Sequence, residues 1–302
     1  MKRRFTGRAL GFAAPLAAAL ALTAACSRLP RPAADEALAL RIMPFNVRYD
    51  EPRDGPNAWP GRKDLVAGVI GFHRPDAAGL QEVLASQLAD LRALLPGFEA
   101  VGVGRDDGRD AGEFNPILFR KDRFRLLATS TFWLSERPDE PGRKGWDAAC
   151  ARIVTWARLR DRWTGRTVVV FNTHFDHVGE TARRESAALV LARILGIAGR
   201  DPFVLTGDLN CTREDAAYRT LLAAPSGGPR LRDARDLSLE PPFGPPASFN
   251  GFRAEPASGL PIDHILAGPG FGVTRTAILP AAVGGRFVSD HNPVVADLRL
   301  AR

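Results

Sequence analysis

The sequence predicts a single α/β domain. Short apolar runs with the length and flanks of strands intermix with segments whose apolar residues have helical spacing. The 302 residues, 45% of them hydrophobic, are enough to bury one large core or two modest ones. No internal repeat and no linker divides residues 36–300, so one domain is the economical interpretation.

The first 25 residues have the features of a secretory signal peptide. Four basic residues at positions 2, 3, 4 and 8 precede an Ala- and Leu-rich run that is too short to span a membrane. The small residues before Cys26 resemble a bacterial lipoprotein signal, in which this cysteine is lipidated and becomes the mature N-terminus. A plain cleavable signal is the alternative. Residues 26–36, with two prolines, then form a tether, and residues 37–302 form the domain.

These features predict an exported protein, a periplasmic or outer-surface lipoprotein anchored to the membrane through its lipid. We also expect a monomer.

Removing the four basic charges of the signal from the formal net charge of +7 leaves +3 for the mature chain. This low net charge gives little support for nonspecific nucleic-acid binding, which depends on clustered Lys and Arg. After Cys26 only Cys150 and Cys211 remain, without zinc-ligand spacing. They can pair in an oxidising compartment, but two buried free thiols are the default expectation.

The expected elements follow from local patterns. Apolar or alternating runs predict strands at residues 37–46, 75–80, 115–120, 124–134, 151–159, 166–173, 203–205, 260–266 and 294–300. Helical spacing predicts helices at residues 65–72, 84–95 and 181–198. We expect the strands at 115–120 and 124–134 to pair. Those at 151–159 and 166–173 should form a hairpin, because Trp163-Thr-Gly165 between them has turn chemistry. Regions rich in Gly, Pro and Asp, such as 47–60 and 102–112, should be loops.

Polar residues recur at the ends of these strands. Asp208 and Asn210 follow the apolar run 203–205 at i, i+2, a spacing that points both side chains to one face of an extended segment. An ordinary turn is the alternative for this stretch alone. Asn46, Glu82, His174 and Asp263 also lie at or within short strands, and Asp290-His291 precedes the last one. Polar side chains gathered at strand ends form catalytic clefts in α/β domains. Oxygen ligands without paired cysteines suit Mg²⁺, or Mn²⁺, better than zinc.

Six motifs occur in an order that resembles the endonuclease/exonuclease/phosphatase superfamily, including deoxyribonuclease I-like enzymes. The motifs are Phe45-Asn46, Gln81-Glu82, Thr173-His174, Gly207-Asp208-Leu209-Asn210, Ile262-Asp263-His264 and Ser289-Asp290-His291. The resemblance covers nearly the whole mature chain and extends to a bacterial lipoprotein-like subgroup. It implies a four-layer sandwich, with two mixed β-sheets face to face and helices outside, and metal-dependent hydrolysis of phosphoesters.

The resemblance also implies a role for each motif residue. Glu82 is the principal metal ligand, with Asn46 and Asp290 completing the site. His291 is the catalytic imidazole, and Asp263 orients it. Asp208 and Asn210 position the attacking water and the phosphate.

The same resemblance extends to residues between these motifs. His174 is a second catalytic histidine, and Glu113 stands where an acid pairs with it. Arg152 holds a phosphate oxygen, and Asp176 and His177 lie in the loop after His174, where they can touch the substrate. His264 should face away from Asp263 and be structural.

Two hypotheses of different classes remain at this point. The first is a Mg²⁺-dependent phosphodiesterase, nuclease or phosphatase exported to the cell envelope. The second is a non-catalytic binding lipoprotein on the same scaffold, since fold alone does not separate them. Retention of Glu82, Asp208 and His291 together favours the enzyme. The substrate stays open between nucleic acid, a phospholipid headgroup and a small soluble phosphoester.

Overall fold

The computed structural model describes residue 1 and residues 39–223, 230–253, 259–280 and 282–300. By its contacts the chain divides into two units, Met1–Arg31 and Pro32–Arg302, and every described helix and strand lies in the second. The predicted signal sequence, the tether and Cys26 lie outside the described residues. In the described part, no helix is long and apolar enough to cross a membrane.

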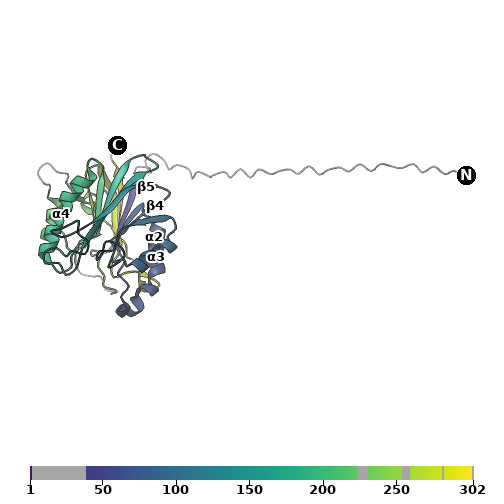
Figure 1. Cartoon of the computed structure of the whole chain (residues 1–302), viewed down its shortest axis with the longest axis horizontal. Helices are drawn as coiled ribbons and strands as arrows, with labels where there is room; N and C mark the ends of the chain where they lie inside the picture. The colour runs from purple at the N-terminus through teal and green to yellow at the C-terminus, as the bar shows by residue number, and fades with distance from the viewer. Residues whose placement is uncertain (2–38, 224–229, 254–258, 281, 301–302) are drawn as a thin grey trace. The chain divides into compact units, whose positions relative to one another are not determined.

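Two six-stranded sheets form the body of the second unit (Figure 1). The first sheet has the order β11 (Phe271–Ile278), β14 (Val294–Leu300), β1 (Ala39–Asn46), β2 (Ala77–Gln81), β4 (Ile117–Arg120) and β3 (Phe98–Val101). The second has the order β5 (Phe124–Trp133), β6 (Ile153–Asp161), β7 (Thr167–His174), β8 (Phe203–Asp208), β10 (Asp263–Ala267) and β9 (Arg232–Asp233). Both sheets are mixed, because β1–β2 and β7–β8 are parallel and the other pairs antiparallel.

Helices cover the outer faces of the two sheets. The helices are α2 (Lys63–His73), α3 (Ala85–Leu94), α4 (Glu180–Ala198), α5 (Ala216–Leu222) and the short α6 (Ala234–Leu237). Two 3₁₀ turns, η1 (Pro52–Asn57) and η2 (Trp59–Gly61), and the small pair β12 (Ala282–Val283) and β13 (Arg286–Phe287) complete the set. One apolar core lies between the sheets, a second joins the first sheet to α2 and α3, and a third joins the second sheet to α4 and α5. The predicted four-layer sandwich is confirmed (Figure 1).

The period of two along each strand decides where the polar residues go. In β1, Leu40 and Ile42 belong to the core between the sheets, whereas Met43 and Phe45 pack under the helices. The same alternation continues to the strand end and turns Asn46 toward the space between the sheets. His174, Asp208 and Asp263 reach this space in the same way, from β7, β8 and β10.

One predicted pairing is wrong. The segments at 115–120 and 124–134 do not form a hairpin, because β4 pairs with β2 and β3 in the first sheet and β5 pairs with β6 in the second. The buried guanidinium of Arg123 bridges the two sheets at this crossing. It pairs with Asp76, just before β2, at 2.7 Å and with Asp161, at the end of β6, at 3.0 Å. The predicted hairpin at 151–159 and 166–173 is confirmed as β6 and β7.

Strands β3, β9, β11, β12 and β13 were not anticipated from the sequence. The loop at residues 241–246 runs beside β11. The N–H of Phe243 donates to the Thr276 carbonyl, and the Phe243 carbonyl accepts from the Ile278 N–H. This backbone pairing covers part of an otherwise exposed sheet edge.

Candidate active site

The polar strand ends meet at a cavity of about 660 Å³ between the two sheets. In the parallel pair β7–β8 His174 lies opposite Asp208, and in the antiparallel pair β8–β10 Asp208 lies opposite Asp263. Asp263 begins its strand and was expected in the middle of one. Because β10 runs antiparallel to β8, its start lies at the same edge as the end of β8. The sheet register therefore brings residues from three strands to one place.

Asn46 connects two carboxylates at this edge. Its amide nitrogen donates to Glu82 Oε1 at 2.9 Å and to Asp208 Oδ2 at 3.0 Å, and its oxygen accepts from the backbone N–H of Arg48 at 3.0 Å. Glu82 follows β2 directly and has a φ of 60°, a left-handed conformation that is costly for a residue with a side chain. Such strain occurs at functional sites, where the surrounding structure holds the residue in place.

Arg48 stands beside the predicted metal ligands and was not recognised from the sequence. Its guanidinium bonds Asp54 at 2.9 Å and lies 3.8 Å from Glu82 Oε2 and 3.9 Å from Asp290 Oδ2. Burial, followed by attraction from His291 and repulsion from Glu82, leaves the pKa of Asp290 raised above its ordinary value. The carboxylates of Glu82 and Asp290 therefore lie close to the same guanidinium, and Arg48 partly compensates their negative charge.

His291 and Asp263 form the predicted imidazole–carboxylate pair. His291 Nδ1 donates to Asp263 Oδ2 at 2.8 Å, and both side chains are buried. Burial alone would lower the pKa of His291, but the charges of Asp263 and then Asp208 outweigh it and raise that pKa well above its usual value. The pair therefore holds a protonated imidazole whose Nε2 lies 3.7 Å from Asp208 Oδ2.

Asp208 is the carboxylate shared by both predicted catalytic histidines. Its Oδ2 lies 3.4 Å from His174 Nε2 and 3.7 Å from His291 Nε2, and its Oδ1 accepts from the backbone N–H of Asn210 at 2.9 Å. Burial and then repulsion from Asp263 raise the pKa of Asp208 to about 7. A carboxylate with a pKa near neutrality is suited to take a proton from water.

His174 is held in place by Asn210, whose amide nitrogen donates to its Nε2 at 2.9 Å and to the Phe175 carbonyl at 3.0 Å. Burial, followed by the charge of Arg152, lowers the pKa of His174 well below its usual value, so the ring is neutral. The expected pairing with Glu113 is not formed. Glu113 binds Arg105 at 2.6 Å instead, and among the described residues His174 Nδ1 has no hydrogen-bond partner.

Asp176 lies behind the pocket wall. It is 1% exposed, and its Oδ1 accepts from the backbone N–H groups of Ala149, Val178 and Gly179. These bonds lower its pKa to about 2 in spite of burial. The other oxygen lies 3.5 Å from Arg152 Nε. Asp176, predicted to contact substrate, is therefore placed to hold Arg152 and two loops.

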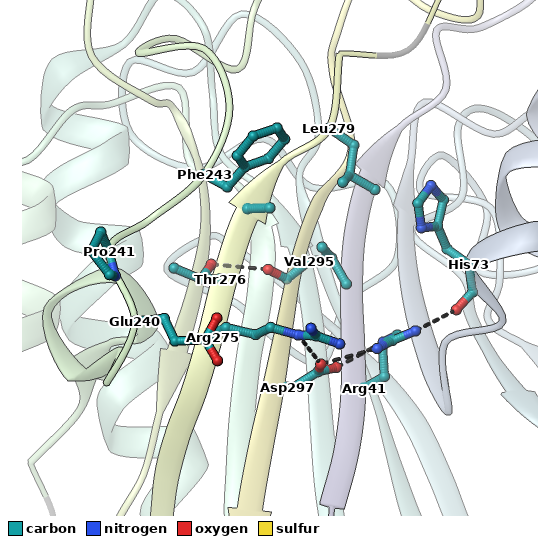
Figure 2. A pocket seen from close by; sticks show the side chains of 11 residues that line it. Arg41, His73, Glu240, Pro241, Phe243, Arg275, Thr276, Leu279, Val295 and Asp297 are labelled. Carbon is teal, nitrogen blue, oxygen red and sulfur yellow. Dashed lines mark hydrogen bonds and ion pairs between the residues drawn. The ribbon is translucent and has the colours of Figure 1, made fainter.

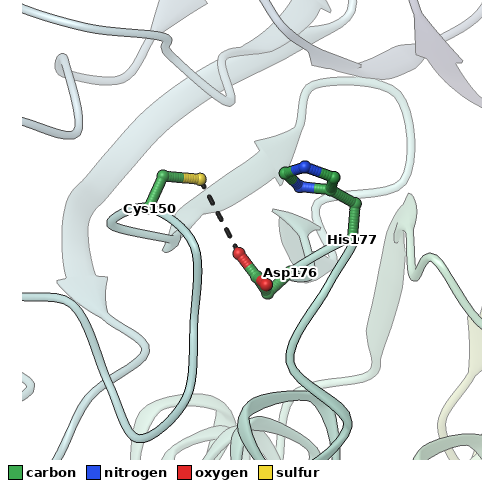
Figure 3. Close-up of side chains that lie close together, drawn as sticks. All are labelled: Cys150, Asp176 and His177. Atoms are coloured by element: carbon green, nitrogen blue, oxygen red, sulfur yellow. Dashed lines mark hydrogen bonds between the residues drawn. The ribbon is translucent and has the colours of Figure 1, made fainter.

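Arg152 and His177, for which substrate binding is predicted, line the pocket. A guanidinium nitrogen of Arg152 lies 3.0 Å from His177 Nδ1. Figure 3 shows Cys150, Asp176 and His177 close together. The Cys150 thiol lies 3.7 Å from Asp176 Oδ2. Although these three could meet around a cation, the neighbouring Arg152 already satisfies the carboxylate. Cys150 and Cys211 are both free thiols; Cys211 is buried as expected, whereas Cys150 is half-buried.

His264 has the structural position that was predicted for it. Its Nδ1 lies 3.1 Å from Asp233 Oδ2 and its Nε2 lies 3.1 Å from the Cys211 carbonyl, on the helix side of the second sheet. Cys211 packs in the core under α4 and α5. The unexpected cysteine in the central motif is thus a small apolar core residue whose carbonyl accepts from His264.

The carboxylates of Glu82 and Asp290 fit a hard divalent cation, and Asn46 adds an amide oxygen that accepts from the N–H of Arg48 and keeps a second lone pair. Glu82 and Asp290 line a cavity with room for water. A second geometric cluster consists of Asp208, Asp263 and His291, within 4.8 Å of one another. It is a poorer site, because the hydrogen bond between Asp263 and His291 already uses one ligand atom of each.

Another cavity, of about 410 Å³, lies over β11, β14 and β1 (Figure 2). Its two arginines are already paired: Arg41 and Arg275 both bind Asp297, each at 2.7 Å. Phe243 and Leu279 lie at its other end. None of the predicted site residues lines this cavity.

Sequence reasoning missed seven residues that line the active-site cavity: Arg48, Tyr49, Arg105, Ala149, Cys150, Phe249 and Ile262. Arg48 and Tyr49 follow Asn46 in the first motif, and their position there was the available signal. Arg105 lies in a charged, glycine-rich loop and Phe249 in a Ser-Phe-Asn-Gly turn, where nothing local points to the site.

Comparison with known proteins agrees with this geometry. The model of the Endonuclease/Exonuclease/phosphatase family matches residues 45–291. An uncharacterized protein (R895) of Acanthamoeba polyphaga mimivirus is 25% identical over 212 residues, which are 58% of this chain and 31% of that protein.

Two solved structures are similar over most of the chain. An endonuclease/exonuclease/phosphatase from Bacteroides vulgatus is 44% identical with a TM-score of 0.82, covering 87% of this chain and 99% of the other. A mannosyl-6-phosphatase from Bacteroides thetaiotaomicron is 34% identical with a TM-score of 0.80, covering 86% and 99%. The sandwich is the deoxyribonuclease I-like fold, and the chain belongs to the endonuclease/exonuclease/phosphatase family.

Proposed function

We propose that this phosphoester hydrolase depends on a divalent cation, preferentially Mg²⁺, held by Glu82, Asp290 and Asn46. The observation that carries the proposal is the arrangement of Asp263, His291 and Asp208 beside these oxygen donors, with the 2.8 Å bond between His291 and Asp263. A bound cation would supply Lewis-acid stabilisation of the phosphate oxygens.

The chain's own residues divide the remaining work. Asp208, with its pKa of about 7, accepts a proton from the attacking water. His291, kept protonated by Asp263, donates from Nε2 to the negative charge that develops on the phosphoryl group. Asn210 and neutral His174 orient the water and phosphate, and Arg152 holds a phosphate oxygen. The water oxygen bonds to phosphorus, the ester P–O bond breaks, and the leaving alcohol oxygen takes a proton from solvent.

A hydrolysis panel tests this proposal. It covers duplex DNA, RNA, sphingomyelin, phosphoinositides and p-nitrophenyl phosphate esters, each with Mg²⁺ and with EDTA. We expect activity with Mg²⁺ on at least one class, and its loss in EDTA and in Glu82→Ala. Glu99→Ala, at an exposed carboxylate on β3, is the matched control and should stay active. Full activity in EDTA would refute the metal mechanism, and inactivity on every class would favour the non-catalytic binder.

The substrate class is supported by the comparisons only as a phosphoester. The printed activity of the Bacteroides thetaiotaomicron structure, mannosyl-6-phosphatase, supports testing sugar phosphates alongside the panel. The low net charge of the mature chain favours a small ester over nonspecific nucleic-acid binding.

Export and lipid anchoring at Cys26 complete the proposal and rest on the N-terminal sequence. Wild type and Cys150→Ser should sediment with membranes, and Cys26→Ser should be soluble. Recovery of wild type as a soluble periplasmic form would support the plain signal instead.

A further inference from the structure

Phe249 forms an apolar wall of the active-site cavity. It is 45% exposed, and in the described part of the chain no other exposed large apolar side chain lines this cavity. Most of the surrounding side chains are charged or hydrogen-bonding. An exposed aromatic ring in a polar cavity offers apolar surface to a ligand.

The turn around Phe249 holds the ring in a fixed position. Phe249 forms a backbone bridge with His291, and its ring meets the imidazole at 5.0 Å between centroids and 67° between planes. The next residues are tied to the motif that contains His291: the N–H groups of Asn250 and Gly251 donate to the Asp290 carbonyl at 2.7 and 3.0 Å.

Gly251 closes this turn, and its backbone conformation favours glycine at this position. It has a φ of +59°, and a Cβ there would lie 3.4 Å from two atoms of the Phe249 ring. A residue with a side chain would be strained at this φ, and its Cβ would be in van der Waals contact with the ring. The ring therefore packs on His291 with Gly251 beside it.

Elsewhere the same cavity is lined by positively charged side chains. Arg105 and Arg152 also line it, and the Nε of Arg105 is buried without a hydrogen-bond partner in the described residues. Phosphate oxygens are the natural partners of guanidinium groups. The organic part of an ester is then left to the apolar wall, which consists of Phe249 with half-buried Ile262 beside it.

We propose that Phe249 is a specificity-determining residue that stacks on a ring in the alcohol part of the substrate, such as a sugar or nucleoside ring. The apolar wall has the size of one ring, whereas an acyl chain would need a longer apolar groove. The inference rests on the proposed phosphoester hydrolysis and narrows its substrate class to esters of cyclic alcohols.

The test compares a hexose 6-phosphate with glycerol 3-phosphate, which share a primary-alcohol phosphate and differ in the ring. Wild type should prefer the ring-bearing ester. Phe249→Ala should lower the ratio of their kcat/KM values about 10-fold, the order of one aromatic contact, and Phe249→Trp should preserve it. Phe243→Ala removes a phenyl ring that is 69% exposed on the other cavity and is the matched control.

The outcomes separate this inference from the proposed function. A wild type without ring preference, or equal losses on both esters in Phe249→Ala, would overturn the inference and make Phe249 a support for His291 alone. If wild type hydrolyses neither ester, the proposed function loses support, and calorimetry in EDTA decides the inference. Wild type should then bind the hexose phosphate about 10-fold tighter than inorganic phosphate, an advantage lost in Phe249→Ala. No advantage in wild type would refute the inference.

Discussion

Two imidazole–carboxylate pairs extend from opposite faces of strand β10. Asp263 and His264 are neighbours, so the alternation of the strand sends their side chains to opposite sides of the second sheet. Asp263 faces the first sheet and accepts from His291 at 2.8 Å. His264 faces the helices and pairs with Asp233 at 3.1 Å.

The two pairs share several properties. Both histidines are 4% exposed. In both, burial would lower the imidazole pKa, but the partner carboxylate outweighs it and the pKa is raised. Burial and a raised pKa therefore do not distinguish a catalytic histidine from a structural one.

The second ring nitrogen makes the difference. His264 Nε2 is bonded to the Cys211 carbonyl, so both ring nitrogens meet acceptors and a protonated ring satisfies both. His291 Nε2 is 3.7 Å from Asp208, beyond a hydrogen bond, and the residue lines the cavity. A catalytic role requires this free atom beside the substrate.

The largest expected effect is the loss of activity in His291→Ala. We expect kcat to fall by roughly 10²–10⁴-fold, the usual contribution of a general acid or base. Asp263→Asn keeps the shape but removes the charge that raises the His291 pKa, so its loss should be smaller. Steady-state kinetics on the best panel substrate measure both variants. A loss below about 10-fold in His291→Ala would remove it from the chemistry.

The second prediction concerns the acid limb of the pH–rate profile. Asp208 acts as a base only when ionised, and burial with Asp263 nearby raises its pKa to about 7. Activity should therefore fall about tenfold per pH unit below that pKa, and Asp208→Asn should be inactive. A flat wild-type profile from pH 8 to pH 5 would contradict this role.

The third prediction concerns His264, on the helix side of β10. His264→Ala removes the buried imidazole from Asp233, which keeps its bonds from the Tyr218 hydroxyl and the Arg235 N–H, and should lower the free energy of unfolding by about 3 kcal/mol. The kcat of the folded variant should stay within a few-fold of wild type. Chemical denaturation and kinetics on the same preparation provide the measurements. A kcat loss as large as that of His291→Ala would make the two pairs functionally alike.

The smallest expected effect is the pH dependence of that stability. The His264 pKa is raised above its ordinary 6.5, so its charged pair stabilises the fold fully below pH 6.5 and less as pH rises through the folded pKa. The stability difference between wild type and His264→Gln should therefore shrink from pH 6 to pH 9. A difference that grows over this range would contradict the raised pKa.

The strand-end residues could be predicted because they depend on local patterns. The period of two and the ends of apolar runs place Asn46, His174 and Asp208 at one edge of the sheets, and the motif order resembles the family.

What could not be predicted depends on distant partners. The separation of β4 from β5 is accompanied by two buried ion pairs of Arg123, which join segments far apart in sequence. Glu113 was expected at His174 but binds Arg105, because loop geometry, and not strand period, directs its side chain.

A double-mutant cycle on His291 and Asp263 tests the central claim most directly. Values of kcat/KM for wild type, His291→Ala, Asp263→Asn and the double variant give the coupling between the two residues. If the pair acts as one unit, the double variant should lose little more than His291→Ala alone. Losses that multiply would mean that Asp263 acts independently, and the pairing would then have no part in the chemistry.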